Sequence, residues 1–99
     1  MSTPNTASTP LAITHHPDIG RFEAIVDGLR CEVDYVQDGR VTRITHTGVP
    51  RPLEGRGIAA ALVAHALAWV RQQGQQVDPV CSYVAVYIRR HPEWQDLLA

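Results

Sequence analysis

A chain of 99 residues, with 44% apolar and 19% charged residues, is long enough for one globular domain and too ordinary in composition for a disordered protein. Its net charge of −1 excludes a bulk electrostatic attraction to nucleic acid or to an anionic membrane. The sequence opens without a secretory signal and has no apolar run long enough to span a bilayer, so we expect a cytoplasmic protein whose two cysteines stay reduced.

The first part of the chain divides into a polar start and an alternating segment. Residues 1–14 are rich in serine, threonine and proline, which predicts a flexible tail before a domain over residues 15–99. Apolar and polar residues then alternate over 20–27, 29–37 and 40–48, and an Asp-Gly pair ends each of the first two runs. Asp-Gly suits a two-residue hairpin turn, because both central positions need positive φ. The pattern predicts three antiparallel strands in a meander.

The second part of the chain predicts two helices and one more strand. A helix over about 56–73 follows from apolar residues at helical spacing, with Gly74 as its end. The segment 75–81 predicts a fourth strand, interrupted by Pro79. A short helix follows with Ser82 as its N-cap, and the apolar residues near the C-terminus fold back as a closing turn. The order is βββαβα, an α+β domain.

A glycine pair at the start of the first helix predicts a phosphate site. Gly55 and Gly57 allow a ligand to approach closely, the helix N-terminus offers free N–H groups, and Arg56 can reach a phosphate. A P-loop is excluded because the sequence contains no lysine. The segment 55–60 also matches the dinucleotide fingerprint, but that motif belongs to a parallel βαβ unit, whereas an antiparallel meander precedes it here. A pyrophosphate site of another kind remains.

The stretches "HTGVPRPLEGRGIAAALVAHAL" and "VDPVCSYVAVYIRRHPEW", at this spacing, resemble the small, single-domain branch of the GNAT N-acetyltransferase superfamily. The resemblance covers about residues 21–98. It implies a GNAT-like fold and acetyl-coenzyme A (acetyl-CoA) as cofactor, with the thioester held where the third and fourth strands splay apart. The strand end from Thr47 to Val49 would pair with the pantetheine arm like an added strand. The residues that would hold the pyrophosphate are Gly55, Arg56, Gly57, Ile58, Ala59 and Ala60.

The sequence departs from the family pattern at two positions. The superfamily carries glutamine or arginine three residues before the first loop glycine, where this chain has Pro52, with Arg51 one step earlier. Gly48 stands where relatives of the small branch often carry a larger or acidic residue. The second departure removes one candidate general base.

Three side chains are candidates for the chemistry of acetyl transfer. Cys81 precedes the last helix, whose N-terminus favours a thiolate; the resemblance implies a part in the transfer, and the alternative is a small residue that lines the cleft. Tyr87 lies where many GNAT enzymes keep the tyrosine that protonates the leaving thiolate, with Tyr83 as its competitor, and packing is an equal alternative. His46, on the third strand, is either a base or a structural histidine. Cys31 lies in mid-strand and is expected in the core.

The leading hypothesis is an N-acetyltransferase that moves an acetyl group from acetyl-CoA to an amine. Turns between the first strands replace the helices that usually help to form the acceptor pocket in the superfamily. An open acceptor side is therefore expected, suited to a protein amine or to completion by a second subunit. The sequence leaves monomer or homodimer open and suggests no metal site. The alternatives are a coenzyme A binding module without turnover and a purely structural domain.

Overall fold

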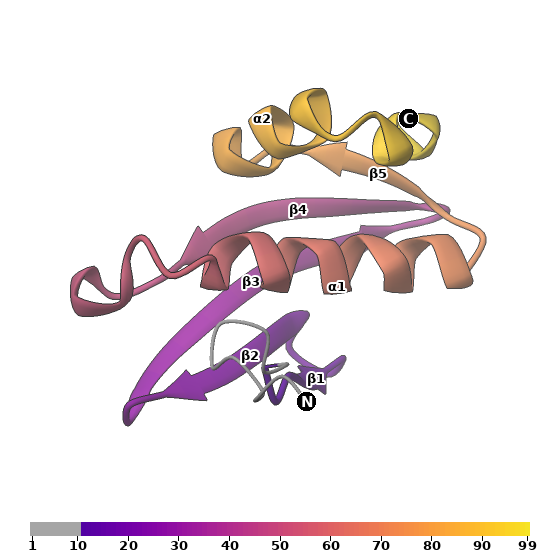
Figure 1. Ribbon diagram of the computed structural model, residues 1–99. Coiled ribbons are helices and arrows are strands. Elements are labelled where there is room, and N and C mark those ends of the chain that lie inside the picture. The colour runs from indigo at the N-terminus through magenta and orange to yellow at the C-terminus, as the bar shows by residue number, and fades with distance from the viewer. Residues whose placement is uncertain (1–10) are drawn as a thin grey trace, which may run out of the picture.

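The computed structural model describes residues 11–99, which form a five-stranded sheet with a long helix across one face (Figure 1). The strands are β1 (Thr14–His16), β2 (Arg21–Val26), β3 (Leu29–Asp38), β4 (Val41–Gly48) and β5 (Gln76–Pro79). They lie in chain order, antiparallel from β1 to β4 and parallel between β4 and β5. The helices are α1 (Ile58–Gln72) and α2 (Ser82–Arg90), with short 3-10 helices η2 (Arg51–Leu53) and η3 (Pro92–Leu97). The expected α+β class, meander and later helix–strand–helix order are confirmed.

The two hairpins of the meander use different loops. Between β2 and β3 the loop is Asp27-Gly28, and both residues have positive φ, +52° and +76°, as the Asp-Gly pair predicts. Between β3 and β4, Asp38 pairs with Val41, so the two loop residues are 39 and 40 and only Gly39 has positive φ. The second turn was therefore predicted one residue too early, because Asp38 stays in the strand.

The folded part of the chain begins earlier than expected. Residues 1–10 of the expected tail lie outside the described residues, but Leu11 and Ile13 pack against the core and Thr14 begins β1. His15 stacks on Phe22 of β2 with ring centroids 4.0 Å apart, so it belongs to the sheet and not to a loose start. A strand of three residues is too short to show a period-two pattern, which is why the sequence did not indicate it.

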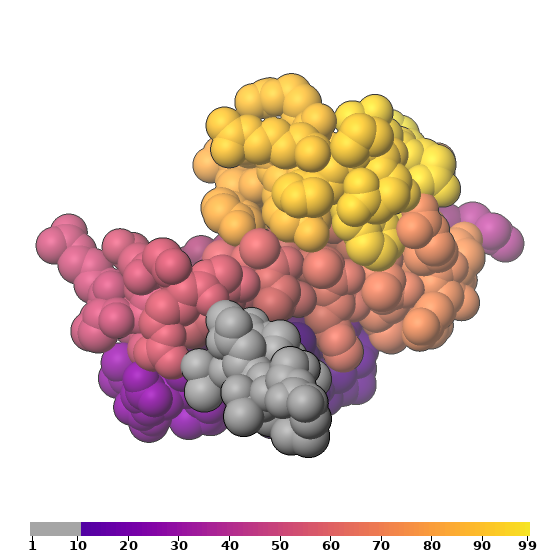
Figure 2. All heavy atoms as spheres, viewed as in Figure 1, coloured from indigo at the N-terminus to yellow at the C-terminus, as the bar shows by residue number. Residues whose placement is uncertain are grey.

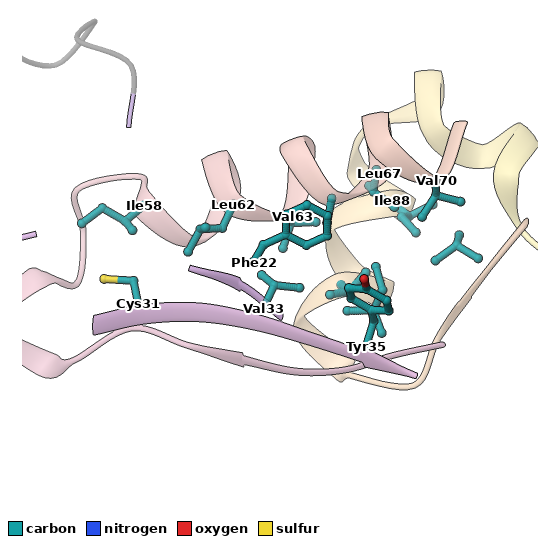
Figure 3. Close-up of a cluster of buried hydrophobic side chains, with 14 of the residues drawn as sticks. Phe22, Cys31, Val33, Tyr35, Ile58, Leu62, Val63, Leu67, Val70 and Ile88 are labelled. Atoms are coloured by element: carbon teal, nitrogen blue, oxygen red, sulfur yellow. The ribbon is translucent and has the colours of Figure 1, made fainter. Parts of the chain in front are cut away.

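The core lies between α1 and the sheet (Figure 3). The buried residues of α1 recur at helical spacing and face alternate residues of β2, β3 and β4. From α1 they are Ile58, Leu62, Val63, Ala66, Leu67 and Val70, and from the three strands Phe22, Ala24, Cys31, Val33, Tyr35, Thr42 and Ile44. The prediction that Cys31 is a core residue is confirmed, and Trp69 of α1 packs against this core while only partly buried. No helix within residues 11–99 combines the length and the apolar character that crossing a membrane requires.

The C-terminal segment, α2 and η3, packs beside α1 and next to β5. The helix α2 begins with Cys81 as its N-cap, one residue before the expected Ser82. The expected closing turn is η3, which buries Leu97 and brings the backbone of Leu98 to a bridge with Val77 of β5. In Figure 2 the α2 and η3 segments, in yellow, form one block against α1, and Arg71 of α1 donates to the carbonyl of Glu93 over 2.8 Å.

The strands β4 and β5 part at the point where α2 begins. Their parallel ladder ends with Ile44 opposite Pro79, and the N–H of Cys81 makes one further bond to the Ile44 carbonyl over 2.9 Å. The predicted fourth strand thus ends at Pro79 rather than at residue 81, because proline has no N–H to continue a ladder. β4 itself runs on to Gly48. Its last four residues, 45–48, extend beyond the ladder with β5 and stay alongside β3, so this strand end is free only on its edge toward β5, which is the expected splay.

Candidate functional site

The loop before α1 gives this helix an open N-terminus. Gly55 and Gly57 adopt left-handed backbone conformations, with φ of +81° and +78°, that other residues rarely adopt. Gly57 is the N-cap of α1, and its carbonyl accepts from the N–H of Ala61. The N–H groups of the first three helical residues therefore lack partners within the helix, at the positive end of its dipole. Such a helix end is a suitable seat for a phosphate.

A cleft of about 420 Å³ opens between this helix end, the free end of β4 and the start of α2. This volume lies in the range of small-molecule sites. The cleft is lined by all the expected cofactor residues except Arg56, namely Thr47, Val49, Gly55, Gly57, Ile58, Ala59 and Ala60. Three further lining residues are Leu53, Glu54 and Tyr83. Leu53 and Glu54 directly precede the glycines, so chain proximity could have indicated them, whereas Tyr83 comes from a distant helix.

Arg56 reaches toward the β2–β3 hairpin instead of the cleft. Its guanidinium donates to a carboxylate oxygen of Asp27 over 2.8 Å. The side chains of Arg56 and Asp27 are 50% and 65% exposed, and an ion pair this open contributes at most about 1 kcal/mol. Arg56 can therefore exchange its partner for a phosphate at small cost.

Cys81 lies where β4 and β5 part. Its thiol donates to the hydroxyl of Thr47, a cleft residue, over 3.6 Å. Burial is the largest influence on this thiol and acts to raise its pKa. The N–H groups of Val84, Tyr83 and Thr47 and the Thr47 hydroxyl favour the thiolate, and together they bring the pKa of Cys81 below its usual value. Although the thiol itself makes no capping bond, its place at the N-cap of α2 thus favours a reactive form.

The two tyrosines of α2 lie one helical turn apart and in different surroundings. Tyr83 lines the cleft and is 41% exposed. Tyr87 packs against the core and stacks on the ring of His91, with centroids 4.0 Å apart. Burial first, and then the neighbouring charges of Glu93 and Tyr83, raise the pKa of Tyr87 despite an opposing hydrogen bond with Trp94. Of the two tyrosines, the structure brings Tyr83 into the cleft lining.

His46 lies on the face of the sheet opposite α1, which we call the outer face. It is opposite Asp34 in the β3–β4 register, whereas its neighbour Thr47 faces the cleft. The Nε2 atom of His46 is 3.2 Å from a carboxylate oxygen of Glu32 on β3, and the imidazole is 53% exposed. His46 therefore flanks the free end of β4 from the side away from the cleft.

Carboxylate oxygens of Glu32 and Asp34 and an imidazole nitrogen of His46, atoms of the kind that bind metal ions, lie within 4.8 Å of one another on this outer face. Both carboxylates already have cationic partners: Arg21 contacts Asp34 at 2.7 and 3.1 Å, and Arg30 contacts Glu32 at 2.9 Å. The negative charge that would attract a metal ion is thus balanced by two guanidinium groups. We describe the five side chains as the outer-face network and assign them no metal.

Comparison with known proteins indicates a family and a fold. A family model described as GCN5-related N-acetyl-transferase matches residues 21–97. Protein NATD1 of Mus musculus is 29% identical over 86 residues, which cover 84% of this chain and 78% of that protein; for Protein NATD1 of Homo sapiens the identity is the same and the coverage is 84% and 76%. A GCN5-like protein from Staphylococcus aureus, solved by NMR, superposes with a TM-score of 0.73 at 23% identity, covering 92% of this chain and 90% of that one.

Proposed function

Because the chain belongs to the family of GCN5-related N-acetyltransferases, we propose that it transfers the acetyl group of acetyl-CoA to an amine. The cleft is the observation that carries this proposal. It extends from the open N-terminus of α1 at one end to Thr47 of β4 and Tyr83 of α2 at the other. Cys81 lies outside this lining, and its thiol contacts the lining residue Thr47. One end suits a pyrophosphate, and the other offers strand edge and acid–base groups for a thioester.

The residues around the cleft fit coenzyme A. The first-turn N–H groups of α1 would hold the pyrophosphate, and Arg56 would join them after leaving Asp27. The free end of β4, with Thr47 and Val49 in the lining, presents backbone N–H and C=O groups to which an extended arm can add like a strand. When bound, acetyl-CoA supplies an activated acetyl thioester.

Cys81 and Tyr83 are the side chains that we assign to the transfer step. With acetyl-CoA in the cleft, the Cys81 thiolate would be the nucleophile for the acetyl carbon, forming a C–S bond as the C–S bond to the coenzyme breaks. Tyr83 would donate its hydroxyl proton to the departing sulfur and regain one from solvent. The amine would then take the acetyl group from Cys81, which returns as a thiolate while the amine nitrogen gives a proton to solvent. Tyr83 is preferred to Tyr87 for its place in the cleft.

The proposed acceptor is an amine, and a protein amine suits the open side of the sheet. The proposed assembly is a monomer or a homodimer. A reducing, cytoplasmic setting is supported by the two free cysteines, Cys31 and Cys81. Because Cys81 adjoins the cleft, the same geometry also allows direct transfer, in which the amine attacks the thioester and the thiol only lines the site.

Binding and chemistry can be tested separately. Coenzyme A should raise the melting temperature, since a ligand at one hundred times its Kd adds about 2.7 kcal/mol to the free energy of unfolding. No shift at millimolar coenzyme would contradict the proposed site. Intact mass after mixing with acetyl-CoA and no acceptor should show one added acetyl group on the wild type and none on Cys81→Ser. An unmodified wild type that still acetylates amines would favour direct transfer.

A second candidate function, a coenzyme A binding module without turnover, is favoured by one observation. Gly48 has no side chain where relatives of the small branch often carry a larger or acidic one. Release of free thiol from acetyl-CoA in the presence of a panel of amines separates the two functions. A protein that is stabilised by the coenzyme and releases no thiol with any amine would be the binding module.

A further inference from the structure

The space beside Gly48 is filled by two side chains from its surroundings. A Cβ atom built on Gly48 would lie 2.9 Å from Nε2 of His46 and 3.1 Å from a carboxylate oxygen of Glu32. Both distances are too short for ordinary contact, so a side chain at position 48 and the Glu32–His46 pair compete for the same place. In this chain an imidazole and a carboxylate therefore stand where a side chain of residue 48 would begin.

The pair also lies beside the proposed site of transfer. Residues 45–48 are the free end of β4, beyond the ladder with β5. On one side this strand end presents Thr47 to the cleft and to the thiol of Cys81, and on the other side it presents His46 to solvent. His46 is thus the chain neighbour of the cleft residue Thr47, on the side of this strand end that faces solvent.

We propose that His46 is the base that takes the proton of the acceptor ammonium and that Glu32 is its positioning residue, an inference that rests on the proposed acetyl transfer. The Glu32 carboxylate accepts from Nε2–H of His46, which leaves the Nδ1 lone pair free for the proton. The neutral amine then forms its N–C bond to the acetyl carbon as the acetyl C–S bond breaks, and the nitrogen gives its second proton to solvent. The resulting imidazolium remains paired with Glu32 until it gives its proton to water.

The surrounding charges leave Glu32 as the direct partner of His46. On β3, Glu32 is held from its other side by Arg30, and Asp34 opposite His46 is bound at two points by Arg21 of β2. On the side of β5, Arg43 bridges Asp38 and Asp78. Removal of the Glu32 charge therefore changes the immediate environment of the imidazole and leaves the Arg21–Asp34 pair in place.

The test is the pH dependence of kcat/KM with one small amine, measured for the wild type, His46→Gln and Glu32→Gln. Loss of a general base lowers kcat/KM by about 10²-fold or more, so His46→Gln should fall by this amount and lose the acidic limb of the profile. Glu32→Gln should lower the plateau, because the imidazole loses the carboxylate that orients it, and Glu32→Asp, which keeps a carboxylate, should recover part of the loss. A purely structural role of His46 would leave the acidic limb in place in His46→Gln.

Two further variants serve as controls. Glu23→Gln removes a carboxylate from a similar pair, Glu23 with His16 at 3.6 Å, two strands away from β4 on the same face, and should leave the whole profile unchanged. Gly48→Ala should act like Glu32→Gln, because its new methyl group displaces the flexible ends of Glu32 and His46 without disturbing the backbone. Stabilisation by coenzyme A should persist in every variant.

The outcomes distinguish this inference from the proposed function. A wild type that turns over, with the same acidic limb in His46→Gln or the same plateau in Glu32→Gln as in Glu23→Gln, overturns the inference and leaves the proposed function standing. A wild type that is stabilised by coenzyme A and acetylates no amine overturns the inference together with the proposed transfer. An acidic limb lost in His46→Gln, together with a lower plateau in Glu32→Gln and in Gly48→Ala, supports it.

Discussion

The two faces of the sheet differ most clearly at neighbouring residues of β4. On the α1 face, Ile44 is fully buried and Thr47 opens onto a cleft lined mainly by apolar side chains and glycine backbone. On the outer face, Arg43 forms ion pairs and His46 contacts the carboxylate of Glu32, and both side chains reach solvent. Burial of apolar surface dominates folding stability, whereas exposed ion pairs add little. The α1 face therefore holds the fold and the proposed coenzyme site, and the outer face is free to carry acid–base chemistry.

The largest effect on stability should come from the α1 face. Ile44→Ala removes a fully buried side chain from the middle of the core, and such changes lower the free energy of unfolding by about 2–5 kcal/mol. Urea denaturation without ligand measures this loss. A change below 1 kcal/mol would show that this face is not the source of stability.

A negative charge introduced into the cleft should abolish coenzyme binding without unfolding the protein. Ala59→Asp places a carboxylate in the first turn of α1, where it repels a pyrophosphate yet suits the helix dipole. The variant should lose the stabilisation of about 2.7 kcal/mol expected at one hundred times the wild-type Kd. Ala61→Asp adds the same charge to the same turn, at an exposed position outside the cleft lining. This variant should keep the stabilisation by the coenzyme. Equal binding by both variants would place the coenzyme elsewhere.

A smaller effect on stability should come from His15 and not from His16, its neighbour in β1, when the pH is lowered. His15 lies on the α1 face against Phe22 and Trp69, and burial, followed by the charges of His65 and His16, lowers its pKa. The unfolded chain therefore takes up the proton first as pH falls. Stability is complete above the ordinary value of 6.5 and declines from there down to the folded-state value.

Urea denaturation between pH 5 and pH 8, a range of about one and a half units on either side of the ordinary histidine pKa, tests this prediction. The acid-side loss of stability should shrink in His15→Gln and persist in His16→Gln, whose histidine is on the outer face. The opposite result would mean that the partly buried His15 does not govern the acid response.

The smallest effect should come from the outer face. Arg43→Gln removes a guanidinium that contacts Asp38 at 2.9 Å and Asp78 at 3.7 Å, next to Ile44 in the chain. Because these side chains are about half exposed, the free energy of unfolding should change by no more than about 1 kcal/mol. Thermal unfolding in low and high salt measures the change. A loss as large as that of Ile44→Ala would remove the contrast between the faces.

The sequence predicted most of the features that depend on local pattern. Alternation with Asp-Gly pairs predicted the meander, and helical spacing predicted α1. The glycines before Ile58 predicted the lining of the cleft, because residues of one loop and one helix turn stay together in any fold. The motif around Cys81 indicated the family, and the parting of β4 and β5 followed from it.

Features that depend on contacts between distant segments could not be predicted. Arg56 was expected on a phosphate and pairs with Asp27, which is near only because the β2–β3 hairpin reaches the glycine loop. Tyr83 and Tyr87 share a helix face, and only the packing of α2 shows which of them lines the cleft. Glu32 gave no signal at all, since its closeness to His46 depends on the β3–β4 register and on the bulge within it.

Amide chemical shifts followed during titration with coenzyme A test the central claim most directly. The account predicts saturable shifts at the end of β4 and the start of α1, above all at Thr47, Val49, Gly55 and Gly57, with β1 and the outer-face residues of β2 unaffected. Saturable shifts centred elsewhere, or none at millimolar coenzyme, would contradict the claim that this cleft is the acetyl-CoA site.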